Sequence, residues 1–319
     1  MRRKTEKVSS KSAVRRLLCL LAALVWLLPA ARAEEDVLTG FTAEDEEYPP
    51  AEYAFDKKDS VRYESDTLIW SIESFTLDGV LCLLTKVWVR DPARQIRKAN
   101  APWGENWGRE ANPRKLTAKI PGAVLSTNAS GYITRAYPDL PEGYPGESSD
   151  YFNTTLGSLV VTDGEVLRNL EGVPFHGLAL TDAGITLHRG TANDTVLAME
   201  PKQTWAFFEQ CVLQEGGVDT LPEEGTWELA DTRYPRAVIA RVNRNNYLML
   251  HVPNRTDSSG LSLHRINTFF FTHFETEWVY NLDGGYSATL IYRQKKKNAG
   301  LTLLAPNRQQ VADILCFTE

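Results

Sequence analysis

Short apolar runs, separated by Gly, Asn, Asp and Pro, recur through most of this 319-residue chain. The runs are rich in β-branched and aromatic residues and are shorter than an ordinary helix, which is typical of strands. They cover residues 68–75, 80–89, 123–125, 156–161, 237–242, 247–252, 278–282 and 288–292. The pattern predicts an α+β fold, a strand-rich single domain with a few helices packed on a mixed sheet.

Two groups of turn residues indicate how some of these strands connect. Residues 243–246 read Asn-Arg-Asn-Asn between two strand-like runs, and Asn tolerates the left-handed backbone that tight hairpins need. We therefore expect residues 236–242 and 247–252 to form a hairpin. Turn residues at 163–164 and 182–184 break the apolar runs between 156 and 188, which predicts a meander there.

One segment has the spacing of a helix. Five apolar residues follow Ser258-Ser259-Gly260 at intervals of three or four: Leu263, Ile266, Phe270, Phe274 and Trp278. This spacing puts them on one helical face, and serines commonly cap the first amides of a helix. We expect a helix that begins after Ser259 and packs this face into the core.

The first 33 residues have the composition of a signal peptide. Basic residues precede an apolar run over 17–28, and residues 31–33 read Ala-Arg-Ala, with small residues where signal peptidase needs them. The run is shorter than the roughly 20 residues that span a bilayer. We expect cleavage after Ala33 and a secreted or cell-envelope protein. The alternative is an uncleaved N-terminal membrane anchor, in which case the leader is the only part expected to contact a membrane.

The composition changes after the leader. Residues 34–66 are acidic and polar, and residues 43–50 read Ala-Glu-Asp-Glu-Glu-Tyr-Pro-Pro. Such a stretch buries little apolar surface. The sequence therefore predicts an acidic linker over 34–66 and one folded domain over 67–319.

The charge of the chain argues against one class of partner. The formal net charge is −6, whereas proteins that neutralise nucleic-acid phosphates carry a clustered excess of Lys and Arg. The one basic cluster, residues 293–297, is expected to face solvent. We expect no nucleic-acid partner.

The cysteines do not define a site. Beyond the leader, Cys82, Cys211 and Cys316 allow at most one internal disulfide. None has a Cys or His neighbour at zinc-ligand spacing, so we expect buried thiols or a single bridge. No metal motif is readable, and the use of a divalent cation stays open.

Residues 281–287 combine several chemically useful groups. They read Asn-Leu-Asp-Gly-Gly-Tyr-Ser and place a carboxylate, two glycines and a hydroxyl between two strand-like runs. Adjacent glycines let backbone approach a ligand closely. On spacing alone the segment is either a hairpin turn or the edge of a site.

A family resemblance favours the site. Residues 281–289 resemble the Asn-Leu-Asp-Gly-Gly-Gly-Ser signature of the phosphodiester glycosidase family. Three other blocks are similar to family segments in the same order, namely residues 124–132, the Pro-Arg-Ala-Val-Ile of 235–239, and the Ser-Ser-Gly-Leu-Ser-Leu of 258–263. The resemblance implies a hydrolase of carbohydrate metabolism that cuts a sugar-1-phosphodiester in a cell-surface or extracellular glycan, such as an exopolysaccharide. The cut bond joins the anomeric carbon to a phosphate oxygen.

The resemblance also implies roles for residues of these blocks. The implied catalytic residues are Asp283, Arg236 and Asn128, with Asp283 as acid, base or metal ligand and Arg236 as a charged fork on the phosphodiester. The implied substrate-binding residues are Ser259, Gly260, Gly284, Gly285 and Ser287. Amides after Ser259 would bind phosphate oxygens at the start of the helix.

Three departures from the family pattern keep alternatives open. Asn128 is followed by Ala-Ser-Gly, Tyr286 replaces the third glycine of the signature, and Phe-Phe-Glu-Gln-Cys at 207–211 replaces a Phe-Gly-Pro block. One alternative is a non-catalytic carbohydrate-binding or envelope-associated protein of the same fold. Another is a phosphodiesterase that cuts the other side of phosphorus.

Two further features have no settled role. Most glycosidases use two carboxylates, and the second is not identified by the sequence; the candidates are Glu209, Asp182 and Glu277. Trp103 and Trp107 lie in one short loop, where they either stack on sugar rings or anchor the loop by packing.

Overall fold

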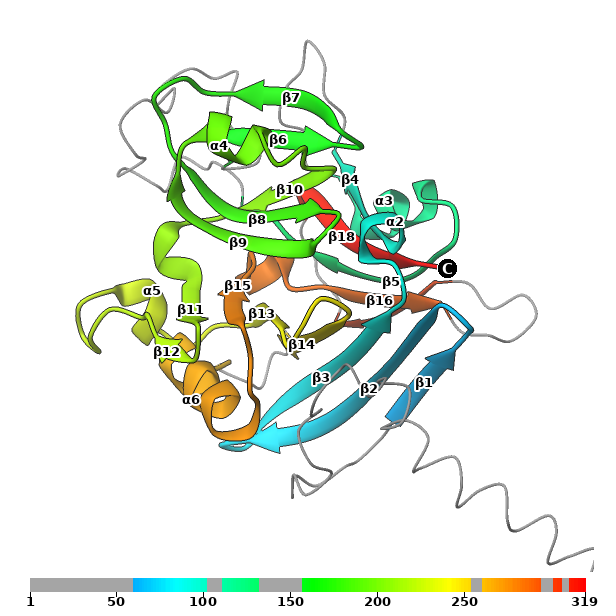
Figure 1. The fold of residues 1–319 in the computed structure, drawn as a ribbon. Coiled ribbons are helices and arrows are strands. Elements are labelled where there is room, and N and C mark those ends of the chain that lie inside the picture. The colour runs from blue at the N-terminus through cyan, green and yellow to red at the C-terminus, as the bar shows by residue number, and fades with distance from the viewer. Residues whose placement is uncertain (1–59, 102–110, 132–156, 254–259, 294–300, 306–309) are drawn as a thin grey trace, which may run out of the picture. The chain divides into compact units, whose positions relative to one another are not determined.

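The computed structural model describes residues 60–101, 111–131, 157–253, 260–293, 301–305 and 310–319 (Figure 1). The chain divides into two units, residues 1–51 and 52–319, and every described residue belongs to the second. Several sequence predictions fall outside the described residues: the leader, residues 34–59 of the linker, Trp103, Trp107, Ser259 and residues 294–297.

The described strands form three antiparallel sheets. The largest has the order β1 (Ser60–Glu64), β2 (Leu68–Leu77), β3 (Val80–Val89), β14 (Asn246–Val252), β13 (Arg236–Arg241), β15 (Trp278–Asn281), β11 (Val212–Glu215) and β12 (Val218–Asp219). The second has the order β7 (Glu165–Asn169), β6 (Leu159–Thr162), β10 (Gln203–Ala206), β8 (Phe175–Thr181) and β9 (Gly184–Thr191). The third has the order β17 (Leu301–Ala305), β16 (Leu290–Arg293), β5 (Ala123–Asn128), β18 (Asp313–Thr318) and β4 (Ile96–Asn100).

The helices of the described residues are few and mostly short. They are α2 (Pro92–Gln95), α3 (Pro113–Lys119), α4 (Asn193–Leu197), α5 (Glu228–Asp231) and α6 (Leu263–His273), with 3₁₀ turns η2 (Glu209–Cys211) and η3 (Gly285–Ser287). The predicted strand-rich α+β class is therefore confirmed, and each of the eight apolar runs contains a strand. None of these helices is both long and apolar enough to cross a membrane.

The sheets differ from the mixed sheet that we expected, because all strand pairs of the described residues run antiparallel. Tight turns join many consecutive strands, and such turns permit only antiparallel pairing. Between β2 and β3, for example, Asp78 and Gly79 both have positive φ, 52° and 78°, as a two-residue hairpin loop requires.

The first strand begins earlier than the predicted domain start at Thr67. β1 starts at Ser60 and pairs with β2 from Ser60 opposite Glu73 to Glu64 opposite Ile69. The Tyr63 ring is buried and stacks on Trp70 at 5.7 Å between centroids. Residues 60–64 alternate between apolar and polar or charged side chains, which is a strand pattern, but the acidic composition of the surrounding segment favoured a linker.

The predicted hairpin of residues 236–252 is confirmed, but its turn works differently. β13 pairs with β14 from Arg236 opposite Val252 to Arg241 opposite Tyr247. None of residues 243–246 has positive φ. Instead, Asn243 Oδ1 accepts hydrogen bonds from the backbone amides of Asn245 and Asn246 at 3.0 and 2.9 Å. The side chain thus closes the turn without left-handed backbone.

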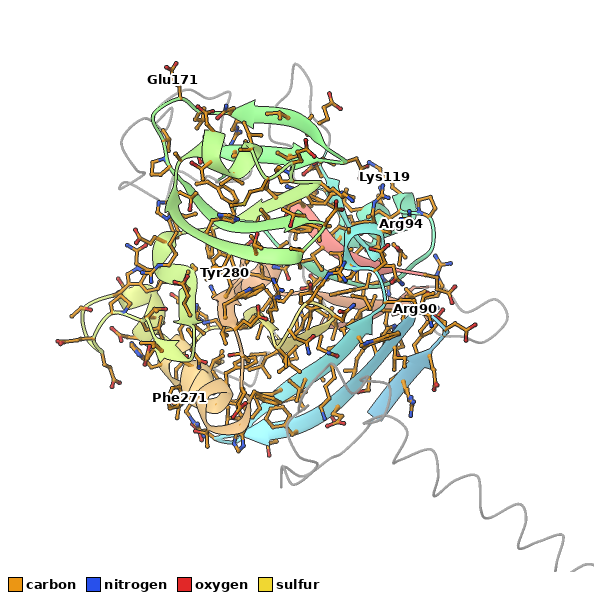
Figure 2. The ribbon with its side chains drawn as sticks, viewed as in Figure 1. Arg90, Arg94, Lys119, Glu171, Phe271 and Tyr280 are labelled. Carbon is orange, nitrogen blue, oxygen red and sulfur yellow. The ribbon has the colours of Figure 1, made fainter. Side chains whose placement is uncertain are left out.

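The predicted meander is only partly correct. β6 pairs with β7 and β8 with β9, but β10, which follows them in the chain, lies between the two hairpins (green strands in Figure 1). A core cluster of buried side chains includes members from all three sheets, among them Trp70, Leu125, Trp205 and Tyr280. The sheets therefore share one core, and Tyr280 lies inside it (Figure 2).

The predicted helix exists as α6, with a different start and end. It begins at Leu263, and its N-cap is Ser262, whose Oγ accepts from the amide of Arg265 at 3.2 Å. Leu263, Ile266 and Phe270 are buried as expected. Phe274 is already extended, and Trp278 opens β15. The expected apolar face therefore continues past the helix into a core strand.

Candidate active site

The segment after β15 connects two sheets and is not a hairpin turn. β15 belongs to the eight-stranded sheet, whereas β16, which begins at Leu290, pairs with β5 in another sheet. Residues 282–289 form the crossing between them. This crossing carries the carboxylate and glycines that the sequence singled out.

The backbone of Asp283 is held on both sides by the end of β5. Its amide donates to the carbonyl oxygen of Ala129 at 2.9 Å, and its carbonyl oxygen accepts from Asn128 Nδ2 at 2.6 Å. Asn128 Oδ1 in turn accepts from the amide of Thr289 at 2.9 Å. One fully buried asparagine therefore bonds to both ends of the crossing.

The side chain of Asp283 lies almost buried, with 9% of the residue exposed. Its Oδ1 accepts a hydrogen bond from the amide of Gly284 at 2.9 Å. A carboxylate oriented in this way has a fixed position relative to the backbone of its own turn. Fixed position is what acid, base or ligand chemistry requires.

The two glycines bring this turn against the start of β13. A methyl group at Gly284 would lie 2.9 Å from the carbonyl oxygen of Pro235 and 3.8 Å from Cδ of Arg236, so no larger residue fits without movement. The amide of Gly285, at φ 59°, donates to the same Pro235 oxygen at 2.8 Å. Glycine is therefore needed at 284 for close approach.

Arg236 lies beneath the turn, with only 2% of the residue exposed. Its Nε donates to the carbonyl oxygen of Leu261 at 3.2 Å, and its Nη2 donates to those of Leu229 and Thr232 at 2.6 and 2.7 Å. The two-pronged fork that we expected on a phosphodiester is thus occupied by backbone carbonyls. Nη1 is the guanidinium nitrogen with no hydrogen bond to a described residue. Burial lowers the pKa of Arg236 to about 10, so it remains a cation at neutral pH.

Gly260 packs where only glycine fits. Its φ is 74°, and an added methyl group would overlap the carbonyl group of Tyr234. Next to it, Leu261 and Tyr234 exchange backbone hydrogen bonds of 3.0 and 3.2 Å. The helix start lies beyond this contact, at Ser262, so the amides that follow Ser259 are not the first amides of α6 as we expected.

Ser287 is buried and hydrogen-bonded within the same turn. It closes η3, where its amide donates to the carbonyl oxygen of Gly284 at 3.0 Å, and it is 2% exposed. The structure therefore brings Asn128, Arg236, Gly260 and the 283–287 turn together from four parts of the chain.

A buried ion pair that sequence reasoning missed supports the Asn128 block. Asp313, at the start of β18, pairs with Lys98 Nζ at 3.0 Å, and both side chains are almost fully buried. The Asp313 carboxylate also accepts from the amide and the hydroxyl of Ser130 at 2.7 Å each. Ser130 belongs to one of the departures from the family pattern, and that departure is the sequence signal from which the pair could have been sought.

A second missed residue is His251, which is fully buried behind Asn128. Its Nε2 lies 2.8 Å from Thr127 Oγ1, and this hydroxyl donates to the carbonyl oxygen of Asn128 at 3.0 Å. Burial lowers the pKa of His251 to about 3, so the ring is neutral at physiological pH. The contact identifies it as a support for the end of β5.

The cysteine nearest the turn is Cys211. Asn281 Nδ2 donates to its Sγ at 3.8 Å, and burial raises the pKa of the thiol to about 12. A thiol that stays protonated is a poor nucleophile. Cys82 and Cys316 are likewise free and buried, and no group of three metal-ligating side chains occurs in the part of the chain that the structure describes.

Comparison with known proteins now decides the family. The family model for phosphodiester glycosidases matches residues 122–318, which is more than half of the chain. The chain belongs to the phosphodiester glycosidase family. A comparison with curated proteins found no match.

Solved structures agree with the fold of this family member. The catalytic domain of zebrafish N-acetylglucosamine-1-phosphodiester alpha-N-acetylglucosaminidase, auto-inhibited by its pro-peptide, matches with a TM-score of 0.58 and 17% identity, over 86% of this chain and 92% of that one. A hypothetical protein from Synechocystis matches with a TM-score of 0.55 and 12% identity, over 83% of this chain and 64% of that one. At these identities the likeness establishes the fold.

The other candidate carboxylates of this family member each have a basic partner. Glu209 faces Arg189 at 3.6 Å, Asp182 faces Lys202 at 2.6 Å, and Glu277 faces Arg241 at 2.9 Å. Glu277 precedes β15 and Asp283 follows it, so the strand's length of about 13 Å lies between them. The geometry therefore gives Glu277 no place beside Asp283.

A cavity of about 540 Å³ lies elsewhere on the protein, between residues 169–174 and 190–194. One of its lining residues, Glu171, is labelled in Figure 2. Asn193 Nδ2 is already bonded to Asn169 Oδ1 at 2.8 Å, and none of the predicted site residues lines the cavity.

Proposed function

We propose that this member of the phosphodiester glycosidase family hydrolyses a sugar-1-phosphodiester in a cell-surface or extracellular glycan. The observation that carries the proposal is the double hold on Asp283, whose backbone amide and carbonyl are both bonded to residues at the end of β5. The hold keeps a nearly buried carboxylate beside the strand that carries Arg236. A carboxylate in a fixed position can accept a proton, and a nearby cation attracts an anionic substrate, so the two together suit hydrolysis of a phosphodiester.

The proposed roles follow from which atoms are already occupied. Asn128 uses both ends of its amide on backbone groups, so we assign it to positioning Asp283. Arg236 has Nε and Nη2 on carbonyl oxygens, so Nη1 and the net charge remain for a phosphate oxygen. Gly284 lets the turn approach Pro235 closely, and Gly285 leaves space for a substrate, because a methyl group there would meet nothing within 4 Å.

The proposed chemistry needs one carboxylate. Water attacks the anomeric carbon while Asp283 accepts its proton, the bond from that carbon to the phosphate oxygen breaks, and the electron pair leaves on the phosphate. The products are a reducing sugar and a phosphomonoester. A phosphate leaves without prior protonation, which removes the need for a second acidic residue; the charge that develops on it is stabilised by Arg236.

We also propose that the chain acts outside the cytoplasm. The support is the basic leader, the apolar run over 17–28 and the Ala-Arg-Ala of 31–33. Sequencing the N-terminus of the protein recovered from an expressing cell tests this. A mature chain that begins at Glu34 supports export with cleavage, whereas an intact Met1 in the membrane fraction supports the anchor.

The activity is tested by hydrolysis in ¹⁸O-labelled water. The full chain is incubated with N-acetylglucosamine-1-phosphodiesters, including UDP-N-acetylglucosamine, and the products are analysed by mass spectrometry. The proposal predicts ¹⁸O in the free sugar and none in the phosphomonoester. A labelled sugar phosphate would mean cleavage on the other side of phosphorus, and binding without turnover would mean a non-catalytic protein. A parallel reaction with a chelator shows whether a divalent cation is required.

A further inference from the structure

Two exposed tyrosines lie at the turn that carries Asp283, one within it and one just before β13. Tyr234 is 42% exposed and Tyr286 is 60% exposed. Few large hydrophobic residues of the described part of the chain are exposed. Besides the two tyrosines they are Val166, Met199, Val218 and Phe271. Two of the three aromatic members of this set therefore lie at the candidate site.

A single backbone hydrogen bond brings the two tyrosines together. The amide of Gly285 donates to the carbonyl oxygen of Pro235 at 2.8 Å, and each tyrosine is the immediate neighbour of one of these residues. Because consecutive Cα atoms lie about 3.8 Å apart, this bond brings the backbones of the two tyrosines close together.

Both rings are carried by backbone that is already fixed. Tyr234 exchanges two hydrogen bonds with Leu261, and its ring lies 5.3 Å from the guanidinium carbon of Arg236. Tyr286 lies in η3, between Gly285 and the buried Ser287. A tyrosine on rigid backbone loses little conformational entropy when it binds, because only two side-chain torsions remain to be ordered.

The chemistry of these rings selects a type of ligand. The face of an aromatic ring is apolar and carries negative π density, while the tyrosine hydroxyl offers a polar edge. One face of a pyranose presents C–H groups, and its rim presents hydroxyls, which matches both parts. The cation beneath Tyr234 adds attraction for a phosphate attached to that sugar.

The family signature has glycine where this chain has Tyr286. A glycine at that place offers no ring, so the contact distinguishes this chain from the pattern that it otherwise resembles. The substitution also leaves the hydrogen bonds of the turn in place, because the amides of Gly285 and Ser287 still bond to Pro235 and Gly284.

We infer that Tyr234 and Tyr286 form an aromatic subsite that stacks on the pyranose ring of the substrate next to the scissile phosphodiester. The subsite rests on the proposed function for the identity of that substrate. Its task is to select phosphodiesters that carry a sugar ring.

Steady-state kinetics and equilibrium binding test the subsite. Tyr286→Ala is compared with Phe271→Ala, a matched control that removes an aromatic ring of 59% exposure from α6 (Figure 2). An aromatic contact of about 0.5–1.5 kcal/mol corresponds to a roughly 2- to 12-fold change. We expect Tyr286→Ala to raise KM by that factor with little change in kcat, Tyr286→Phe to restore most of it, and Phe271→Ala to match the wild type.

Calorimetry separates the subsite from the catalytic proposal. The probes are the methyl phosphodiester of N-acetylglucosamine-1-phosphate and dimethyl phosphate, which has no ring. Weaker binding of the sugar probe to both Tyr234→Ala and Tyr286→Ala, with dimethyl phosphate unaffected, supports the subsite even where no turnover occurs. Equal sugar binding by wild type and Tyr286→Ala overturns it, even where hydrolysis is normal.

Discussion

Asn128 and Asp283 stand at the ends of strands from different sheets, and Asn128 Nδ2 donates to the carbonyl oxygen of Asp283 at 2.6 Å. The same side chain accepts from Thr289 at the far end of the crossing. The position of the candidate catalytic carboxylate therefore depends on a fully buried side chain that is hydrogen-bonded at both ends of its amide.

Replacing Asn128 with alanine tests this dependence. The change removes the hydrogen bonds from Asn128 to the carbonyl oxygen of Asp283 and the amide of Thr289. Each buried partner that loses its bond costs about 1–3 kcal/mol. If the loss of one such bond raises the activation free energy by the same amount, kcat falls about 5- to 150-fold. Hydrolysis kinetics measure the loss. Asn245→Ala is the control. Asn245 Nδ2 donates to the carbonyl oxygen of Val89 at 2.7 Å, and this bond lies outside the candidate site, so the kcat of the variant should equal that of the wild type.

Gly260 and Gly79 offer a matched pair for the close contact with Tyr234. Both have φ near 75°, but a methyl group at Gly79 meets nothing within 4 Å, whereas one at Gly260 overlaps the Tyr234 carbonyl. Gly79→Ala should lower the free energy of unfolding by about 1–2 kcal/mol, the cost of left-handed backbone. Gly260→Ala should lower it further and reduce activity. Urea unfolding measures both, and equal losses would show that the contact relaxes freely.

The buried pair of Asp313 and Lys98 should be a stability determinant. Asp313→Asn leaves the Lys98 charge buried without its counter-ion, which typically costs about 3–5 kcal/mol. Asp182→Asn removes a shorter pair, with Lys202 at 2.6 Å, from an exposed position and should leave the unfolding free energy nearly unchanged. If the two variants unfold alike, the buried pair has no special role. A selective fall in kcat for Asp313→Asn would tie it to Ser130 and the Asn128 block.

The sequence predicted the strands well because their signal is local. Apolar runs and turn residues located β13, β14 and their hairpin, and the 3.6-residue spacing located α6. Which strands share a sheet depends on packing between distant segments. The crossing at 282–289 resembles a hairpin loop in sequence, and the pairing of β16 with β5 shows otherwise.

The sequence predicted which segments of the candidate site lie together better than it predicted their hydrogen bonds. The family motifs named Asn128, Arg236 and Asp283, and the fold brings their blocks together. No sequence pattern indicates that Arg236 donates hydrogen bonds to three carbonyl oxygens, or that Asp313 pairs with Lys98 from another strand. The role of a single Asp in an apolar strand depends on tertiary contacts that the local sequence does not reveal.

His251 should make stability depend on pH. Its pKa in the folded protein, about 3, lies below its ordinary value of 6.5, so the unfolded chain binds more protons between these values. Its contribution is therefore present above pH 6.5 and is lost as the pH falls toward 3, with a slope of up to about 1.4 kcal/mol per pH unit. His251→Gln, which does not titrate, should show a shallower decline in urea unfolding between pH 7 and 4. Parallel declines would remove His251 as the cause.

The central claim is that Asp283 performs the hydrolysis of a sugar-1-phosphodiester. The direct measurement is the kcat of wild type, Asp283→Asn and the surface control Asp163→Asn with N-acetylglucosamine-1-phosphodiesters. We predict a fall of at least about 100-fold for Asp283→Asn, as expected when a general base is lost, with KM little changed and Asp163→Asn equal to wild type. Wild-type turnover that survives Asp283→Asn undiminished would contradict the account.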